Sequence, residues 1–288
     1  SFPTRRSSDL NDLPIKLKFE KLKLTADISA KPIIIEDKII ILCADGTVTA
    51  FNSNDYSKVW SLNLQGKKTK NKAFGGGIVH SDGKLYVTNG SQMLEILNPD
   101  NGRRIMSKKF PDIIVSQPVI NRNLILLLTL GNQLFAIEKN TGAMIWDHAG
   151  NPETLTYGDV PPPAIDPMGR VFVAYSSGQI YLLNPENGSV LWQYDLSSAD
   201  HMPGLLPTNV STRPILEANN IYLADSIGKF YKFDTKTGNI VWQKPIQDVQ
   251  TINNVGNSIF ITTNGRQAAA IDKMDGRIIW ATDIVDDV

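Results

Sequence analysis

The chain has 288 residues, of which 29 are basic and 29 are acidic, and 42% of its residues are hydrophobic. This charge balance gives the chain no electrostatic attraction for nucleic acid, and its hydrophobic content is sufficient for one large core. No window reaches the roughly 18 apolar residues of a membrane-spanning helix. The single cysteine, Cys43, excludes a disulfide within the chain, and its apolar neighbours predict a buried, inert thiol.

The first ten residues do not fit the pattern of the rest of the chain. Residues 1–10 match the peptide that a common short-read sequencing adapter encodes in frame. We therefore expect them to be non-native, although a natural disordered leader is the alternative. The native sequence would then enter at Asn11, past its own start, and residues 283–288 predict a second truncation because no closing element follows the last strand pattern. Residues 11–288 are predicted to form a single incomplete domain.

An eleven-residue phrase recurs six times along the chain. Successive copies end at positions that lie 46, 40, 46, 50 and 38 residues apart, and five of the six end in tryptophan. The copies span residues 50–60, 96–106, 136–146, 182–192, 232–242 and 270–280. This period suits one four-stranded propeller blade and is too long for most helical repeats. The sequence thus predicts an all-β fold, a β-propeller of four-stranded antiparallel blades with six blade motifs.

Each phrase predicts a strand, a tight turn and a second strand. A glycine in five of the turns supplies the positive φ that such turns need, at positions 102, 142, 188, 238 and 276. The first copy has Tyr56 at this position, where a left-handed backbone costs about 1–2 kcal/mol. We expect its turn to adopt another geometry. Two further strand patterns precede each phrase and complete four strands per blade.

The closing tryptophans lie at one fixed point of the repeat: Trp60, Trp146, Trp192, Trp242 and Trp280. A tryptophan can bury about 150–250 Å², so a recurring one is suited to wedging one blade against the next. Stacking on a redox cofactor or a sugar is the alternative, but the repetition favours a structural role.

The repeat resembles the quinoprotein-type propeller repeat over residues 32–280. Three segments resemble the BamB family of outer-membrane assembly lipoproteins in particular: Gly-Gly-Gly and Gly-x-Leu-Tyr-Val within residues 75–87, Asn-Gln-Leu-Phe-Ala at 132–136, and Tyr-Ser-Ser-Gly-Gln-Ile-Tyr at 175–181. This resemblance implies eight blades, a lipid-anchored protein at the periplasmic face of the outer membrane, and binding to the POTRA domains of a BamA-like barrel insertase.

Two connections between blades, 147–162 and 193–213, are longer than the others and are expected to emerge on one face of the disc. The resemblance implies that they contact the POTRA partner. The residues of this chain that would make the contact are Leu155, Tyr157, Gly158 and Asp159 in the first connection, and Asn209, Ser211 and Arg213 in the second. Gly158 and Asp159 fit the family pattern, but Tyr157 replaces an arginine, and Asn209 and Ser211 replace acidic residues. The alternative is that both loops merely cap the blades.

No catalytic, metal or cofactor motif is present. His80, His148 and His201 are predicted to lie in three separate blade connections, without the spacing of a zinc site. A quinone-dependent dehydrogenase shares the repeat, but many of these enzymes carry an adjacent-cysteine pair that a chain with one cysteine lacks. A propeller that binds a sugar or peptide in its central channel is a third possibility, and polar groups converging on the axis would favour it. The sequence favours a non-catalytic scaffold without a cofactor.

Overall fold

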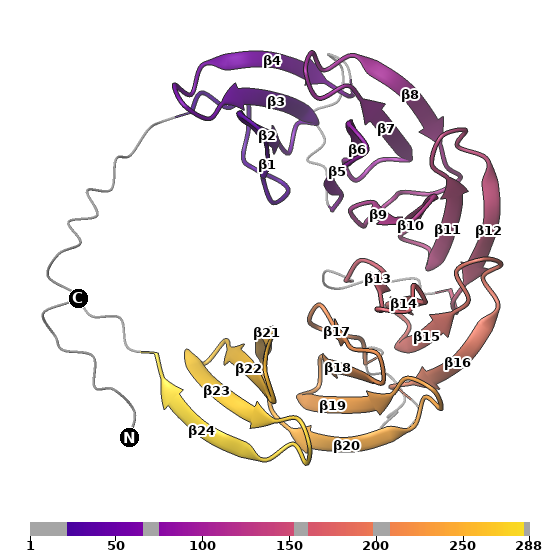
Figure 1. The fold of residues 1–288 in the computed structure, drawn as a ribbon, viewed down its shortest axis with the longest axis vertical. Coiled ribbons are helices and arrows are strands. Elements are labelled where there is room, and N and C mark those ends of the chain that lie inside the picture. Colours follow the sequence, from indigo (N-terminus) through magenta and orange to yellow (C-terminus); the bar gives the residue numbers. More distant parts are fainter. Residues whose placement is uncertain (1–21, 66–74, 153–160, 198–207, 285–288) are drawn as a thin grey trace, which may run out of the picture.

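The computed structural model describes residues 22–65, 75–152, 161–197 and 208–284. These residues form six four-stranded antiparallel sheets set side by side around a common centre (Figure 1). An open sector separates the first sheet from the sixth. The described residues contain no helix, and therefore none that could cross a membrane. The predicted all-β propeller of four-stranded blades is confirmed for six blades, and the total of eight stays a prediction.

The strands run from the centre to the rim in chain order within each blade. Blades one to three comprise β1 (Ile33–Ile35), β2 (Lys38–Leu42), β3 (Thr47–Asn52) and β4 (Lys58–Asn63); β5 (Gly77–Ser81), β6 (Lys84–Thr88), β7 (Met93–Leu97) and β8 (Arg104–Lys109); and β9 (Val119–Asn121), β10 (Leu124–Leu128), β11 (Gln133–Glu138) and β12 (Met144–Ala149). Blades four to six comprise β13 (Ala164–Ile165), β14 (Val171–Ala174), β15 (Gln179–Leu183) and β16 (Val190–Asp195); β17 (Ile215–Leu216), β18 (Asn220–Ala224), β19 (Lys229–Asp234) and β20 (Ile240–Pro245); and β21 (Val249–Val255), β22 (Ser258–Thr263), β23 (Gln267–Asp272) and β24 (Ile278–Asp283).

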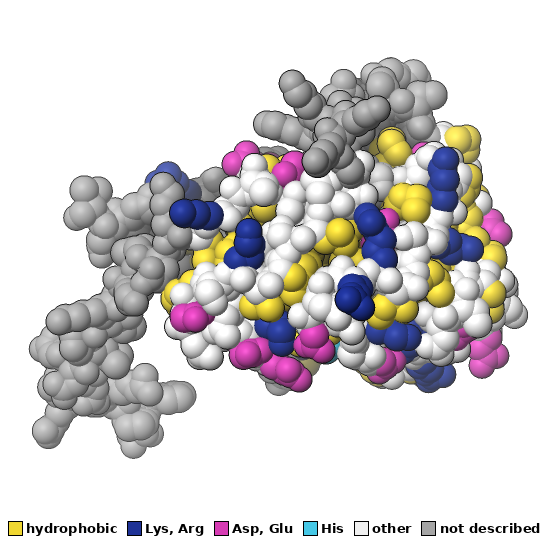
Figure 2. Space-filling view, turned by 90° about the horizontal axis from the view of Figure 1, so that it is seen from above, with side chains coloured by type: hydrophobic (Ala, Val, Ile, Leu, Met, Phe, Trp, Pro, Cys, Tyr) yellow, Lys and Arg dark blue, Asp and Glu magenta, His cyan; other side chains and the backbone are white. Residues whose placement is uncertain are grey.

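The hydrophobic core lies between neighbouring blades. The two middle strands of a blade are buried on both faces, which explains apolar runs such as Leu124–Leu128 in β10. Side chains of β14 and β15 pack against β18 and β19 in one cluster that includes Phe172, Leu182, Leu223 and Phe233. The outermost strands are mostly exposed, and the one buried residue of β12 and of β16 is the tryptophan. Figure 2 shows the side of the disc, where acidic, basic and apolar side chains all occur.

The expectation for Tyr56 is wrong. Its φ of 59° falls in the left-handed region, and its N–H donates to the carbonyl of Asn52 as the N–H of Gly102 does to that of Asn98, each over 2.9 Å. The turns differ in what lies against them. A Cβ at Gly102 would approach the Trp60 ring to 2.5 Å, whereas Tyr56 is partly exposed and no described blade precedes it. Packing against an indole, together with φ, therefore accounts for glycine at this position.

Four of the five blade tryptophans bridge to the following blade. Their indole N–H groups donate to turn carbonyls there, over 2.8 Å from Trp60 to Pro99 and from Trp146 to Pro185, 2.9 Å from Trp192 to Thr235 and 3.2 Å from Trp242 to Lys273. Trp280 is 43% exposed, and no described blade follows it. In the second blade Met106 takes the place of tryptophan, and its sulfur would lie 3.0 Å from a Cβ at Gly142.

Replacing Gly188 with alanine is expected to lower the free energy of unfolding by about 2–3 kcal/mol, from left-handed strain and overpacking together. The new Cβ would lie 2.6 Å from the Trp146 ring at a φ of +71°. Gly83 provides the control, because it has a φ of +67° and nothing within 4 Å of a Cβ. Gly83→Ala should cost only about 1 kcal/mol. Urea unfolding of both variants measures the difference, and equal losses would show that the indole tolerates a methyl group.

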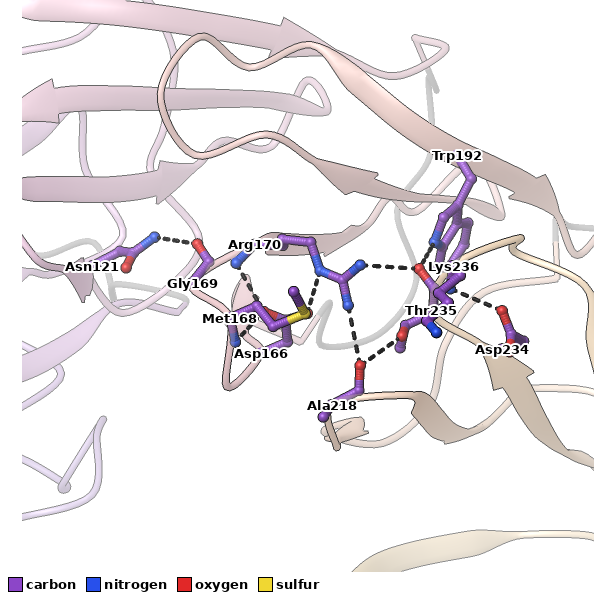
Figure 3. Close-up of polar contacts among 10 residues, drawn as sticks. All are labelled: Asn121, Asp166, Met168, Gly169, Arg170, Trp192, Ala218, Asp234, Thr235 and Lys236. Atoms are coloured by element: carbon purple, nitrogen blue, oxygen red, sulfur yellow. Dashed lines mark hydrogen bonds and ion pairs between the residues drawn. The ribbon is translucent and has the colours of Figure 1, made fainter.

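Polar contacts also join blades three, four and five (Figure 3). The amide of Asn121 donates to the carbonyl of Gly169 over 2.9 Å. The Arg170 guanidinium pairs with the fully buried carboxylate of Asp166 at 2.6 Å and donates to the carbonyls of Thr235 and Ala218, each over 3.3 Å. The carbonyl of Thr235 also accepts the Trp192 indole N–H. One turn carbonyl of blade five thus receives both a charged and an apolar anchor from blade four.

Candidate functional site

All described connections between blades begin on the same face of the disc. The residue that follows an outermost strand donates its N–H to the turn between the two middle strands of the same blade, as Leu64 does to Gly46, Gly150 to Asn132 and Leu196 to Gly178. These bonds fix the point at which each connection leaves its blade. We call this side the connection face, and the opposite side, which carries the turns of the repeated phrase, the turn face.

The second long connection is anchored at both ends. The N–H of Thr208 donates to the hydroxyl of Ser197 over 3.0 Å, so the residues flanking 198–207 meet at the base of this connection. Beyond this point the chain pairs with blade five, because Val210 forms an isolated antiparallel bridge with Asp225. The rigid sheet thereby positions residues 208–213 on the connection face.

The sequence-predicted residues are only partly described. Leu155, Tyr157, Gly158 and Asp159 all fall in 153–160, outside the described residues. Asn209 is held through its backbone, which exchanges hydrogen bonds with Ser226, while its side chain has no bond to the described residues. The Ser211 hydroxyl donates to the carbonyls of Ala224 and Asp225 over 3.3 and 3.2 Å. Of these two side chains, Asn209 is therefore the one whose polar atoms form no bond to the described residues.

Arg213 instead extends towards the propeller axis. Its Nη2 donates to Gln117 Oε1 over 3.2 Å, between residues 96 positions apart in the sequence. Both line an axial cavity of about 550 Å³ to which every described blade contributes. Each described blade contributes at least one lining residue; one from each, in order from blade one to blade six, are Ser29, Gly76, Gln117, Pro162, Thr212 and Thr251.

Sequence reasoning missed Gln117 and the cavity, although a signal existed. Gln117, Pro162 and Arg213 each precede a proline that opens a blade, at 118, 163 and 214. The residue before a proline is restricted to extended backbone, so these three positions enter their blades in a similar way. The structure places all three in the cavity wall. In blades three, four and five the residue before the blade-opening proline thus faces the axis, whereas Lys31, before Pro32 in blade one, does not line the cavity.

The histidine prediction is also partly wrong. His80 and His148 lie on β5 and β12 and not in connections, because the strands extend further than the sequence pattern indicated. His201 lies outside the described residues. The Tyr175 hydroxyl donates to the carbonyl of His148 over 3.0 Å, so the Nδ1–H of His148 must be the donor in its 2.8 Å bond to that hydroxyl. This contact joins blades three and four beside the first long connection.

Acid should destabilise the chain through His148. Burial lowers the pKa of its imidazole from the ordinary 6.5, and burial likewise raises the pKa of Tyr175. The unfolded state therefore binds the proton first as the pH falls through about 6.5, and stability declines until the folded imidazole is also protonated. His148→Asn should reduce the stability loss between pH about 7.5 and about 5.5. Urea unfolding across this range checks it, and an identical pH dependence in the variant would contradict it.

The described residues contain no group of three or more His, Cys, Asp or Glu side chains arranged to hold a metal ion. Cys43 is fully buried, in contact with a small apolar cluster that includes Ile41 and Phe51. The polar side chains of residues 208–213 and of the cavity wall are hydroxyls, amides and one guanidinium. Such groups donate and accept hydrogen bonds, and this set is suited to binding.

Known proteins share both the sequence and the fold. Residues 44–282 match the family model described as outer membrane protein assembly factor BamB. An uncharacterized protein of Rickettsia conorii is 34% identical over 260 residues, which cover 89% of this chain and 62% of that protein. Outer membrane protein assembly factor BamB of Shewanella oneidensis is 21% identical over 242 residues, 81% of this chain and 60% of that protein. The chain thus spans less than two thirds of the length of these relatives.

Solved structures show the same architecture. The crystal structure of BamB from Moraxella catarrhalis matches with a TM-score of 0.76 at 16% identity, covering 90% of this chain and 77% of that one. A quinohemoprotein alcohol dehydrogenase from Pseudomonas putida HK5 matches with a TM-score of 0.66 at 14% identity, covering 91% and 61%. At these identities the structures establish the propeller fold alone, while the family model covers most of the sequence. The chain belongs to the BamB family of outer membrane protein assembly factors.

Proposed function

We propose that this chain is a non-catalytic scaffold of the outer-membrane β-barrel assembly machinery, and that its connection face binds the POTRA domains of a BamA-like insertase. The observation that carries the proposal is the anchoring of residues 208–213 on that face by the sheet of blade five. Family membership supports the same role. By resemblance, its location would be the periplasm at the inner face of the outer membrane.

Preorganisation is what the fold would contribute to binding. A segment whose backbone is already fixed loses little conformational freedom when a partner docks, so more of the contact energy appears as affinity. Ser211 is fixed to blade five through its N–H, which donates to Ala224, and through its hydroxyl hydrogen, which the carbonyls of Ala224 and Asp225 share. The scaffold would then act by holding the insertase in one orientation while client barrels fold.

The partner contact in this chain would be polar and uncharged at Asn209 and Ser211, where the family resemblance implies acidic residues. Neutral hydrogen bonds are screened by salt far less than ion pairs are. Binding through these two positions should therefore depend only weakly on ionic strength, and a partner surface with amides or hydroxyls would suit them better than a basic patch.

Asn209→Arg should weaken binding to the POTRA domains by roughly tenfold or more, because a bulky, positively charged side chain would then stand on the docking surface. Asn140→Arg is the matched control, since Asn140 is an exposed asparagine on the turn face and its side chain has no bond to the described residues. Pull-down and calorimetry with purified POTRA domains measure both variants. Equal weakening by the two, or no binding of the unaltered chain, would overturn the proposal.

The dehydrogenase alternative rests on shared architecture, since quinohemoprotein alcohol dehydrogenases match the fold. The one cysteine, Cys43, leaves this chain without the adjacent-cysteine pair found in many such enzymes. We propose that the chain is not an enzyme. Dye reduction in the presence of added quinone, calcium and alcohols tests this directly, and turnover above the buffer rate would favour the dehydrogenase.

A further inference from the structure

The axial cavity has one charged wall residue among those described, Arg213, and no acidic one. Its guanidinium is exposed, and its one hydrogen bond to a described residue goes to the neutral Gln117 amide oxygen. A guanidinium has five N–H donors, so most of them are left for another acceptor. A cation facing a cavity without a counter-charge favours the binding of an anion.

The other polar groups of the wall also favour an acceptor-rich ligand. Gln117 uses its oxygen to accept from Arg213, which leaves its NH₂ group as a donor. The buried hydroxyl of Thr212, in the same wall, has no hydrogen-bond partner among the described residues. A buried polar atom without a partner costs free energy, and a ligand that provides an acceptor would recover it. The wall thus combines one guanidinium, the side-chain amides of Gln117 and Gln250, and one unpaired hydroxyl.

The backbone of blade two beside Gln117 bears no side chains, and Gly76 forms a parallel bridge with Ser116 there. Gly76 has a φ of +91°, and a Cβ there would lie 2.3 Å from the carbonyl oxygen of Thr88. Gly75 is equally restricted, since its Cβ would lie 2.3 Å from the carbonyl oxygen of Val115. Close packing against these two carbonyl oxygens therefore requires glycine at both positions, and this part of the cavity wall is bare backbone.

We propose that the axial cavity binds the carboxylate of an acidic polypeptide segment, held by the guanidinium of Arg213 and the side-chain amide of Gln117. One positive charge matches the single charge of a carboxylate better than the two charges of phosphate, and the planar guanidinium fits a carboxylate through two parallel hydrogen bonds. We assign the carboxylate to a polypeptide because Ser211, in the cavity wall, lies two residues from Asn209 on the connection face. A polypeptide that contacts this face can therefore extend an acidic side chain into the cavity. The inference goes beyond the proposed function, since it stands on the cavity and needs no particular partner.

The test measures, by NMR titration and with no other protein present, how tightly the full chain binds the capped peptide Gly-Glu-Gly-Glu-Gly. The same titration is made with the peptide in which glutamine replaces each glutamate. The acidic peptide should bind about tenfold or more tightly than the glutamine peptide, and Arg213→Gln should remove this difference. Arg213→Lys should retain part of it, because it keeps the charge and loses the planar fork. Arg103→Gln, a substitution of an exposed arginine on the turn face, should leave binding unchanged.

Three results would overturn the inference. They are equal affinity for the two peptides, acidic-peptide binding that survives Arg213→Gln, and displacement of the acidic peptide by inorganic phosphate at lower concentration than by acetate. Urea unfolding of Arg213→Gln guards against misfolding, and Arg213→Lys provides a second variant if the first unfolds. Because no POTRA domain is present, failure here leaves the proposed function untouched, and failure of POTRA binding leaves this result untouched.

Discussion

Replacing Trp192 with alanine is expected to lower the free energy of unfolding by about 3–5 kcal/mol. The indole is only 7% exposed, and it packs between Phe172 and Phe233 at ring-centroid distances of 6.5 and 6.3 Å. Its N–H also donates to Thr235 in the next blade. The substitution therefore opens a cavity between blades four and five and removes a hydrogen bond that crosses the same boundary.

Trp280→Ala is the matched control for this prediction. Trp280 holds the same position in the repeat but is 43% exposed, with the ring of Phe260 at 5.8 Å. Its loss should cost about 1 kcal/mol, as is usual for a partly exposed side chain. Urea unfolding of this 288-residue chain compares the two variants. Equal destabilisation would show that the indole acts within its own blade and not as a wedge between blades.

The second large effect is expected for Arg170→Met, at about 3 kcal/mol, because it leaves a buried carboxylate without its cation. The Asp166 side chain is fully buried, and the carbonyls of Thr235 and Ala218 would each lose a donor (Figure 3). Asp166 would still accept from the N–H groups of Met168 and residue 170. The turn in blade four should persist while its contact with blade five weakens.

Arg277→Met makes the same chemical change at a surface ion pair. Arg277 is 69% exposed and lies 3.6 Å from Asp272, so its loss should cost less than about 1 kcal/mol. Thermal or urea unfolding distinguishes the two substitutions. If Arg170→Met is as mild as Arg277→Met, the contacts of Arg170 with blade five contribute little to stability.

The repeat made the blades predictable, because each copy carries the same strand, turn and closing residue and therefore folds in the same local way. Contacts between side chains of neighbouring blades could not be predicted from the repeat. Tyr56 illustrates the difference, since the sequence indicates the cost of its left-handed φ but not the lack of an indole against it. His148 illustrates it too, since its tyrosine partner belongs to the next blade.

The candidate site was predictable in position and less so in composition. The length of the connection at 193–213 pointed to a binding face, and the structure anchors its described end, Asn209 and Ser211, to blade five. Arg213 and Gln117 both precede a blade-opening proline, but the contact between them depends on how blades three and five are placed around the axis, which a local pattern does not give. In the first connection, 147–162, the partner residues stay a prediction, because they fall within 153–160, outside the described residues.

The most direct test of the connection face is photo-crosslinking in cells that produce this chain with its own insertase. A photoreactive amino acid replaces Asn209 on the connection face or Asn140 on the turn face, one at a time. We expect an adduct with the BamA-like insertase from position 209 and none from position 140. An adduct from position 140 alone, or none from position 209, would contradict it.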